Sequence, residues 1–335
     1  MGRIGRQTIT LDNPPVIQAF AAVAGKKEGE GPLSDSFDLV FQDSFFGQET
    51  WEKAESAMLN RALALALGKA GLDYKDVDCV FSGDLLNQCA GSAFGIRGTD
   101  IPFFGLYGAC STMAESLALA SMTVSAGYAN NAAAVTGSHF CSAERQFRMP
   151  LEYGGQRTPT AQWTVTGAGC AVLSRQGAGP KITCVTPGRI VDLGIKDLSN
   201  MGAAMAPAAF DTLYSHFSDT GRAPDYYDLI LTGDLGLVGS GILRDMFYRE
   251  GVNISGIHND CGLMIFDREK QDAHAGGSGC GCSASVLCGE IMRKMRQGGL
   301  KKVLFAATGA LMSPVTSMQG ESIPGICCAV SIEGE

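Results

Sequence analysis

The chain has 335 residues, of which 45% are hydrophobic and 18% charged, enough apolar material for one large core or two smaller ones. Its 26 basic and 34 acidic residues give a net charge of −8, which argues against nucleic-acid binding. Residues 1–15 are too polar for an export signal. The longest apolar stretch, Met113–Gly137, is interrupted by Glu115 and two asparagines, so we expect no transmembrane helix and only peripheral contact with any membrane.

Helix-like segments alternate with short apolar runs along the chain. A helix is predicted over Glu52–Ala70, where apolar residues recur at helical spacing before Gly71, and another over Phe210–Phe217, before Gly221. Buried strands are predicted over Val77–Phe81, Ala132–Val135, Ala171–Leu173, Leu229–Leu231 and Val303–Ala307. This alternation indicates parallel strands joined by crossover helices, which is an α/β fold.

The second half of the chain repeats the first. Asp78–Leu85 is DCVFSGDL and Asp228–Leu235 is DLILTGDL, at an offset of 150 residues. At an offset of 172, Cys110-Ser111 matches Cys282-Ser283 and Ala134–Gly137 matches Ala306–Gly309.

Because the order of the two matches is preserved, we predict two halves of similar topology, residues 1–178 and 179–335. The change of offset gives the second half 172 − 150 = 22 extra residues, which we place around Gly251–Gly276.

The twelve cysteines are spread over the chain without any C-x-x-C pair, so they are predicted to be reduced thiols and not zinc ligands. Cys110 differs from the other cysteines in its local sequence. It follows the small residues of GLYGA and precedes a helix that Thr112 and Glu115 would open as a capping box. At a helix N-terminus the dipole favours a thiolate and the amides favour an anion, so Cys110 is either a nucleophile or a buried thiol in a tight turn.

Three other residues stand where parallel strands are predicted to end, the usual position of ligands in α/β sheets. Asp84 and Asp234 follow the two repeated strands, and His139 follows the strand that begins near Ala132. Each has a structural alternative. The aspartates could cap the turns that follow them, and His139 could be hydrogen-bonded near the core.

The helix, acidic loop, strand and GACS segment, within a duplicated α/β chain, resemble the thiolase superfamily of condensing enzymes over nearly the whole sequence. This resemblance implies a thiolase-like duplicated αβαβα fold with two mixed sheets around central helices, and usually a homodimer. More specifically, GSHFCSAERQFRMP at Gly137–Pro150 and NDCGLMIFD at Asn259–Asp267 resemble the stage V sporulation protein AD family of endospore-forming bacteria. That family implies binding of dipicolinic acid (pyridine-2,6-dicarboxylate), its uptake into the developing spore and its release in germination.

Condensing enzymes of this superfamily need His with His, or His with Asn, beside the cysteine. By the resemblance, those positions are occupied by Thr232–Leu235 (TGDL) and Gly277–Gly281 (GSGCG), which contain neither residue. An ionised Asp234 could not donate a hydrogen bond to an enolate oxygen. We therefore expect a non-catalytic binding protein. The alternatives are an active thiolase or ketoacyl synthase condensing coenzyme A or carrier-protein thioesters through Cys110, and an assembly subunit with an unused cavity.

A dicarboxylate needs donors or cations for its charges and an apolar slot for its ring. The amides from Cys110 through Ser111 to Thr112 could hold one carboxylate, and Arg145, Arg148 or Arg157 the other, although each arginine could equally be a surface charge or part of an ion pair. A calcium chelate would instead use Asp84 and Asp234. The predicted ligand-binding residues are Asp84, Cys110, Ser111, His139, Arg148 and Asp234.

No cofactor is expected beyond Ca²⁺ carried with the ligand. The resemblance further implies other stage V sporulation A membrane subunits as partners. It also implies a peripheral location at the inner membrane of the forespore or spore.

Overall fold

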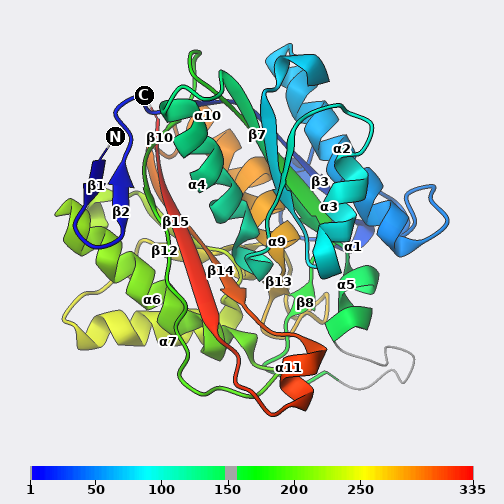
Figure 1. Cartoon of the computed structure of the whole chain (residues 1–335). Helices are drawn as coiled ribbons and strands as arrows, with labels where there is room; N and C mark the ends of the chain where they lie inside the picture. Colours follow the sequence, from blue (N-terminus) through cyan, green and yellow to red (C-terminus); the bar gives the residue numbers. More distant parts are fainter. Residues whose placement is uncertain (1, 148–156, 335) are drawn as a thin grey trace.

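The computed structural model describes residues 2–147 and 157–334. Helices and sheets alternate in five layers (Figure 1), with one pair of helices between the two halves of the sheet and further helices outside each half. The outer helices are α2 (Trp51–Ala70) and α3 (Ala90–Ile96) on one side and α6 (Met201–Thr220) and α7 (Gly236–Arg249) on the other. The central helices are α4 (Thr112–Ser125) and α9 (Cys280–Val286), the latter extended by a π-helical turn and α10 (Met292–Arg296).

The strands of the two halves follow the same spatial order. In the first half the order is β3 (Val16–Ala24), β9 (Gly167–Ser174), β7 (Asn131–Ser138), β5 (Cys79–Gly83) and β6 (Phe103–Gly105). In the second half it is β10 (Lys181–Thr186), β15 (Gly325–Glu333), β14 (Lys302–Ala310), β11 (Leu229–Thr232) and β12 (His258–Asp260). The predicted mixed strand pairing and the duplicated topology are therefore present. The boundary predicted after residue 178 falls in the turn between β9 and β10.

Shorter elements complete the chain: β1 (Gly2–Ile4), β2 (Thr8–Thr10), α1 (Lys26–Gly29), β4 (Leu39–Val40), α5 (Phe140–Phe147), β8 (Trp163–Thr164), α8 (Cys261–Met264), β13 (Gly277–Ser278) and α11 (Pro314–Met318). None of the helices in the described ranges combines the length and apolarity needed to cross a membrane.

Two features of the sheets differ from the sequence-based expectation. The halves form one continuous sheet and not two, because β3 and β10 meet at a single pair, Lys181 opposite Val16. The predicted strand Ala171–Leu173 lies in β9, which runs antiparallel to both of its neighbours, β3 and β7. Parallel pairing joins β5 with β6 and β7, β11 with β12 and β14, and the short pairs β3–β4 and β8–β13.

Local sequence explains the best-predicted helix. Thr50 caps α2 by accepting a hydrogen bond from the Lys53 amide, and Gly71 ends it in the left-handed conformation with φ of 68°. In α6 the apolar periodicity covers only the predicted Phe210–Phe217, whereas the helix begins at Met201 and contains Pro207. The start was missed because a proline inside a helix usually marks a boundary.

The strand register also refines the alignment of the two halves. Ser82 lies opposite Val135 and Gly105, while its repeat partner Thr232 lies opposite Ala306 and Asp260. Val135 therefore corresponds to Ala306, an offset of 306 − 135 = 171, so the offset of 172 is wrong by one residue in this strand. The second half consequently carries 171 − 150 = 21 extra residues between β11 and β14.

Candidate functional site

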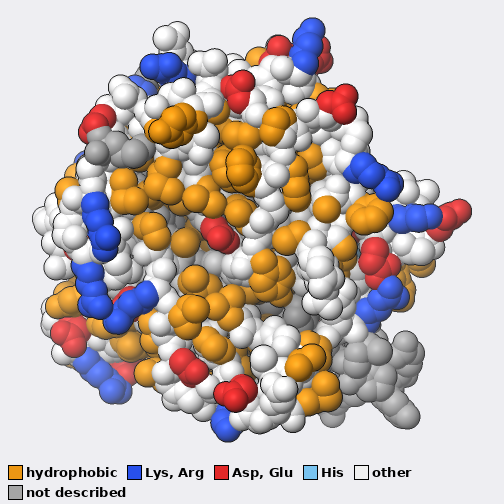
Figure 2. All heavy atoms as spheres, viewed as in Figure 1, with side chains coloured by type: hydrophobic (Ala, Val, Ile, Leu, Met, Phe, Trp, Pro, Cys, Tyr) orange, Lys and Arg blue, Asp and Glu red, His pale blue; other side chains and the backbone are white. Residues whose placement is uncertain are grey.

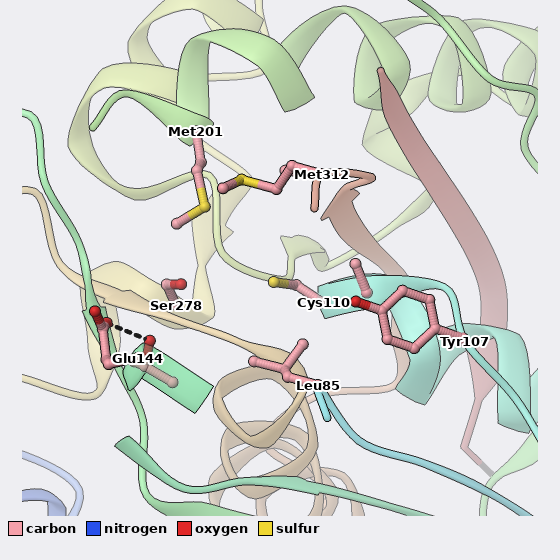
Figure 3. Close-up of a pocket in the computed structure, with 10 residues that line it drawn as sticks. Leu85, Tyr107, Cys110, Glu144, Met201, Ser278 and Met312 are labelled. Atoms are coloured by element: carbon pink, nitrogen blue, oxygen red, sulfur yellow. Dashed lines mark hydrogen bonds between the residues drawn. The ribbon is translucent and has the colours of Figure 1, made fainter. Parts of the chain in front are cut away.

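A small cavity opens beside Cys110, where β5, β6 and β14 end (Figure 3). Its volume is about 40 Å³, which is space for a few water molecules. The apolar part of the wall includes Leu85, Met201 and Met312, and the polar part includes Cys110, Glu144 and Ser278. Figure 3 shows Met201 and Met312 on one side of the cavity and Leu85 and Cys110 across from them.

The carboxyl group of Asp234 lies beside the thiol of Cys110 and acts on its pKa. The carboxyl group accepts two hydrogen bonds, from the amide of Gly279 at 2.8 Å and from the hydroxyl of Thr308 at 2.9 Å. Asp234 is fully buried and Cys110 is 6% exposed. The structure thus brings together two of the predicted residues, Cys110 and Asp234, from opposite halves of the chain.

The electrostatics of this pair oppose a reactive thiolate. Burial raises the pKa of Cys110 well above its usual value, and the neighbouring charge of Asp234 raises it further. Of the two alternatives for Cys110, these shifts favour the buried thiol over a thiolate stabilised by a helix terminus. Burial also raises the pKa of Asp234 to about 7, against the lowering effect of the hydrogen bond from the Gly279 amide. Asp234 is therefore not held in the ionised form at neutral pH.

The predicted capping box at the start of α4 does not form. The Thr112 hydroxyl donates to the carbonyl of Ala109 at 2.6 Å, and Glu115 has a buried carboxylate oxygen without a hydrogen-bond partner. The Ser111 hydroxyl and amide both donate to the carbonyl of Gly108, and the Thr112 amide bonds to Ala109. These amides are occupied by the turn itself, so they do not form the predicted carboxylate site, and Ser111 does not line the cavity.

Asp84 has the structural role that was its alternative. One carboxylate oxygen accepts from the Leu86 amide at 2.7 Å, and the other accepts from the amide and hydroxyl of Ser92, each at 2.6 Å. The side chain is fully buried and does not line the cavity. It fixes the loop between β5 and α3.

His139 lies in a different pocket, together with Lys27 and Trp163. Its Nε2–H donates to the carbonyl of Ser44 at 2.8 Å, and its Nδ1 accepts from the Cys141 amide at 3.2 Å. Burial lowers its pKa, which favours the neutral ring. His139 therefore holds the loop around Ser44 and does not face Cys110.

The candidate arginines have separate positions. Arg148 lies outside the described residues. Arg145 forms an ion pair with Glu52, and Arg157 contacts Glu144 at 3.5 Å and donates to the Gln162 carbonyl at 2.6 Å. Neither Arg145 nor Arg157 belongs to the cavity wall.

Sequence reasoning missed several residues of the site. Glu144 lines the cavity and accepts a hydrogen bond from the Thr164 hydroxyl at 2.6 Å, the dashed line in Figure 3. Met201 and Met312 form much of the apolar wall, and no motif marks them. Thr308, near the end of β14, could have been found by applying the strand-end rule to the second half as well as the first. Within residues 2–147 and 157–334, no three His, Cys, Asp or Glu side chains are grouped so as to hold a metal ion.

The sequence matches a known protein family over nearly its whole length. The family model described as stage V sporulation protein AD matches residues 5–333. The stage V sporulation protein AD of Bacillus subtilis (strain 168) is 45% identical over 329 residues, covering 98% of this chain and 97% of that protein.

Solved structures with a similar fold are distant in sequence. A variant of OleA from Xanthomonas campestris aligns with a TM-score of 0.63 at 13% identity, covering 99% of this chain and 100% of the other. The 3-oxoacyl-[acyl-carrier-protein] synthase III of Aquifex aeolicus VF5 aligns with a TM-score of 0.55, also at 13% identity, covering 96% and 99%. These similarities establish the thiolase-like fold, and at this identity they establish the fold alone.

Proposed function

The chain belongs to the stage V sporulation protein AD family, and on that premise we propose that it is a non-catalytic protein that binds dipicolinic acid in the cavity beside Cys110. In this proposal it serves the uptake of dipicolinate into the developing spore and its release in germination. The observation that carries the non-catalytic part is the identity of the charged group beside the Cys110 thiol. It is the carboxyl group of Asp234, where a condensing enzyme needs an imidazole or amide.

No histidine is available to replace that missing partner. The sequence has four, and each bonds elsewhere. His139 holds Ser44, His216 bonds Thr186 and Tyr227, His258 bonds Thr232 and Arg244, and His274 lies 3.1 Å from Asp272. A proton-transfer pair at Cys110 would therefore require a rearrangement of buried hydrogen bonds.

The charge of the wall supports dipicolinate in the form of its calcium chelate. The described residues that line the cavity include the carboxylate of Glu144 and no lysine or arginine. The wall itself offers a free dianion no cation, since Arg157 lies outside it and pairs with Glu144 at 3.5 Å, whereas Ca²⁺ neutralises the dicarboxylate and prefers additional oxygen ligands. In the proposal, Glu144 and the Ser278 hydroxyl face the metal side of the chelate, and Leu85 faces the ring.

Entry of the ligand requires the cavity to widen. A pyridine dicarboxylate is larger than the space of about 40 Å³, so side chains must move. Methionine is unbranched and adapts its shape readily, and both Met201 and Met312 are only partly buried. We assign the opening movement to these two side chains.

Isothermal titration with dipicolinate, with and without calcium, tests the proposal. The wild-type protein should bind in the presence of calcium, and Glu144→Gln should weaken this binding by about tenfold, the effect of losing one charged contact. Glu52→Gln provides the control, because Glu52 pairs with Arg145 away from the cavity. Absence of binding under both conditions would refute the proposed ligand. Equal binding by both variants would place the ligand outside this cavity.

We further propose that the protein forms a homodimer through β6, the edge strand of the first half. Phe103 and Phe104 of this strand are 38% and 52% exposed, and Phe94 of the adjoining α3 is 58% exposed. Exposed edge strands with large apolar side chains favour pairing with another strand. Hydrophobic side chains also gather over the region of α4 on the face seen in Figure 2. Phe104→Glu should convert a dimer to a monomer in analytical ultracentrifugation.

Membrane subunits of the same sporulation system are the proposed partners, at the inner membrane of the forespore or spore, where the protein would be peripherally attached. Co-purification of those subunits with the chain from detergent-solubilised membranes tests this.

A further inference from the structure

The two repeated turns after β5 and β11 are held by different carboxylates. In the first half, the amide of Leu86 donates to Asp84, two residues earlier. In the second half, the corresponding amide is that of Gly236, and it donates to Asp260 at 3.0 Å and not to Asp234. The preceding amide, of Leu235, also donates to Asp260, at 2.9 Å. The same turn is therefore capped from within in one half and from a neighbouring strand in the other.

The strand register explains how this difference arises. Asp260 lies opposite Thr232 in β12, and the residue at the same place in the first half is Gly105, opposite Ser82 in β6. Glycine has no side chain, so in the first half nothing from the neighbouring strand reaches the turn, and Asp84 caps it. In the second half, Asp260 caps the turn in place of Asp234.

We propose that Asp260 is a positioning residue for the site: by holding the turn after β11, it leaves the carboxyl group of Asp234 to face Cys110, Gly279 and Thr308. The effect of Asp260 on ligand binding rests on the proposed function, whereas its effect on the orientation of Asp234 rests on the contacts described above. The repeated S/T-G-D-L motif thus has two different roles: its aspartate caps a loop in the first half and acts on the Cys110 thiol, behind the cavity wall, in the second.

Asp260 is itself held firmly. The Thr232 hydroxyl donates to it at 2.7 Å, and this hydroxyl also bonds the Nε2 of His258 at 3.0 Å. The Nδ1 of His258 in turn accepts from Arg244 at 3.0 Å. This chain of bonds runs from α7 through β12 and β11 to the turn. His258 and Asp260 both belong to β12, near the start of the extra residues in the second half.

The carboxyl groups of Asp234 and Asp260 are also close enough to influence each other, since the charge of Asp260 raises the pKa of Asp234. The other titratable groups that interact with Asp260 or Asp234 in the described residues are thiols. Cys261 and Cys282 interact with both carboxylates, and Cys110, Cys280 and Cys327 interact with Asp234. A change at Asp260 should therefore reach the Cys110 thiol through Asp234.

The experiment compares Asp260→Asn with Asp84→Asn, which removes the equivalent cap in the first half. The first readout is the rate of Cys110 alkylation by iodoacetamide as a function of pH, followed by peptide mass spectrometry. The second is calcium-dependent dipicolinate affinity. Loss of the Asp260 charge alone would let Asp234 ionise more easily and so would slow the labelling of Cys110. The positioning role predicts that the loosened turn in Asp260→Asn separates Asp234 from Cys110 and outweighs this effect, so the thiolate forms at lower pH and labelling at pH 7.5 rises about tenfold, corresponding to one pKa unit. Asp84→Asn should change this rate less than about threefold.

Equal alkylation profiles for Asp260→Asn and the wild type, or equal shifts in the two variants, would overturn the positioning role. If Asp260→Asn fails to fold, as judged by circular dichroism, Thr232→Val weakens the same contact and should shift the profile in the same direction, and no shift would refute the inference. If the wild type does not bind dipicolinate, the proposed function fails, while the alkylation profiles still test Asp260.

Discussion

The buried carboxyl group of Asp234 should make the stability of the protein depend on pH in a defined way. Burial raises its pKa to about 7 in the folded chain, whereas an aspartate in an unfolded chain has a pKa of about 3.9. Because the folded pKa is the higher one, the folded state binds the proton more tightly, and ionisation costs folding free energy. This destabilisation is absent below about pH 4, grows as the pH rises and is complete above about pH 7.

The size of the effect follows from the two pKa values. Linkage gives a loss of about 1–2 kcal/mol at pH 5 and about 4 kcal/mol at pH 8, a difference of about 2–3 kcal/mol. Asp234→Asn cannot ionise and should not show this dependence. The substitution also alters the hydrogen bonds to Gly279 and Thr308, which adds an offset of about 1–3 kcal/mol that is the same at both pH values.

Urea unfolding followed by circular dichroism at pH 5 and pH 8 measures the difference. The free energy of unfolding of the wild type relative to Asp234→Asn should fall by about 2–3 kcal/mol between the two pH values. Asp245→Asn, at an exposed position on α7 paired with Arg249, is the control for the substitution itself. A relative free energy that stays constant from pH 5 to pH 8 would show that Asp234 ionises normally, and the description of the Cys110 site would then be wrong.

Three further results are expected. Cys110→Trp should abolish calcium–dipicolinate binding in calorimetry by filling the cavity, whereas Cys110→Ala should weaken it by no more than about 1–2 kcal/mol, since sulfur chemistry is not required; complete loss with alanine would contradict this. Iodoacetamide at neutral pH should label the half-buried Cys141 before Cys110, because burial and Asp234 hold Cys110 as a neutral thiol; faster labelling of Cys110 would restore the nucleophile hypothesis. Acetyl or acetoacetyl thioesters should show no turnover above that of the Cys110→Ala variant, and measurable condensation would favour an enzyme.

The fold could be predicted from the sequence because its main signal is repeated. The strand followed by S/T-G-D-L occurs twice, and each copy is followed by a second matching segment in the same order. This repetition already indicates a duplicated α/β chain. The structure adds the antiparallel strands β3, β9, β10 and β15, which the repeat did not reveal. Strands buried on both faces lack alternation of polar and apolar residues, so their direction cannot be read from their composition.

The site could be predicted only in part, for a different reason. Cys110 and Asp234 were identified because each stands beside a recognisable motif. The capping box at Thr112 was wrong because a hydroxyl can bond a preceding carbonyl as easily as a following amide, and the turn at Ala109, with φ of 49°, presents that carbonyl. His139 ends a strand as expected, but the loop around Ser44 takes its ring away from the cavity. These choices depend on neighbours that are distant in sequence.

Asp84 and Asp234 show this dependence most clearly. They occupy the same place in the same repeated motif, so any rule based on local sequence must give them the same role. What separates them is the residue on the adjacent strand, Gly105 in one half and Asp260 in the other. A duplicated fold can therefore acquire an asymmetric site by one side-chain replacement outside the motif. Because Asp260 caps the turn in the second half, Asp234 is left to act on the Cys110 thiol. The two halves therefore contribute unequal groups, Cys110 from one and Asp234 from the other, to a single site.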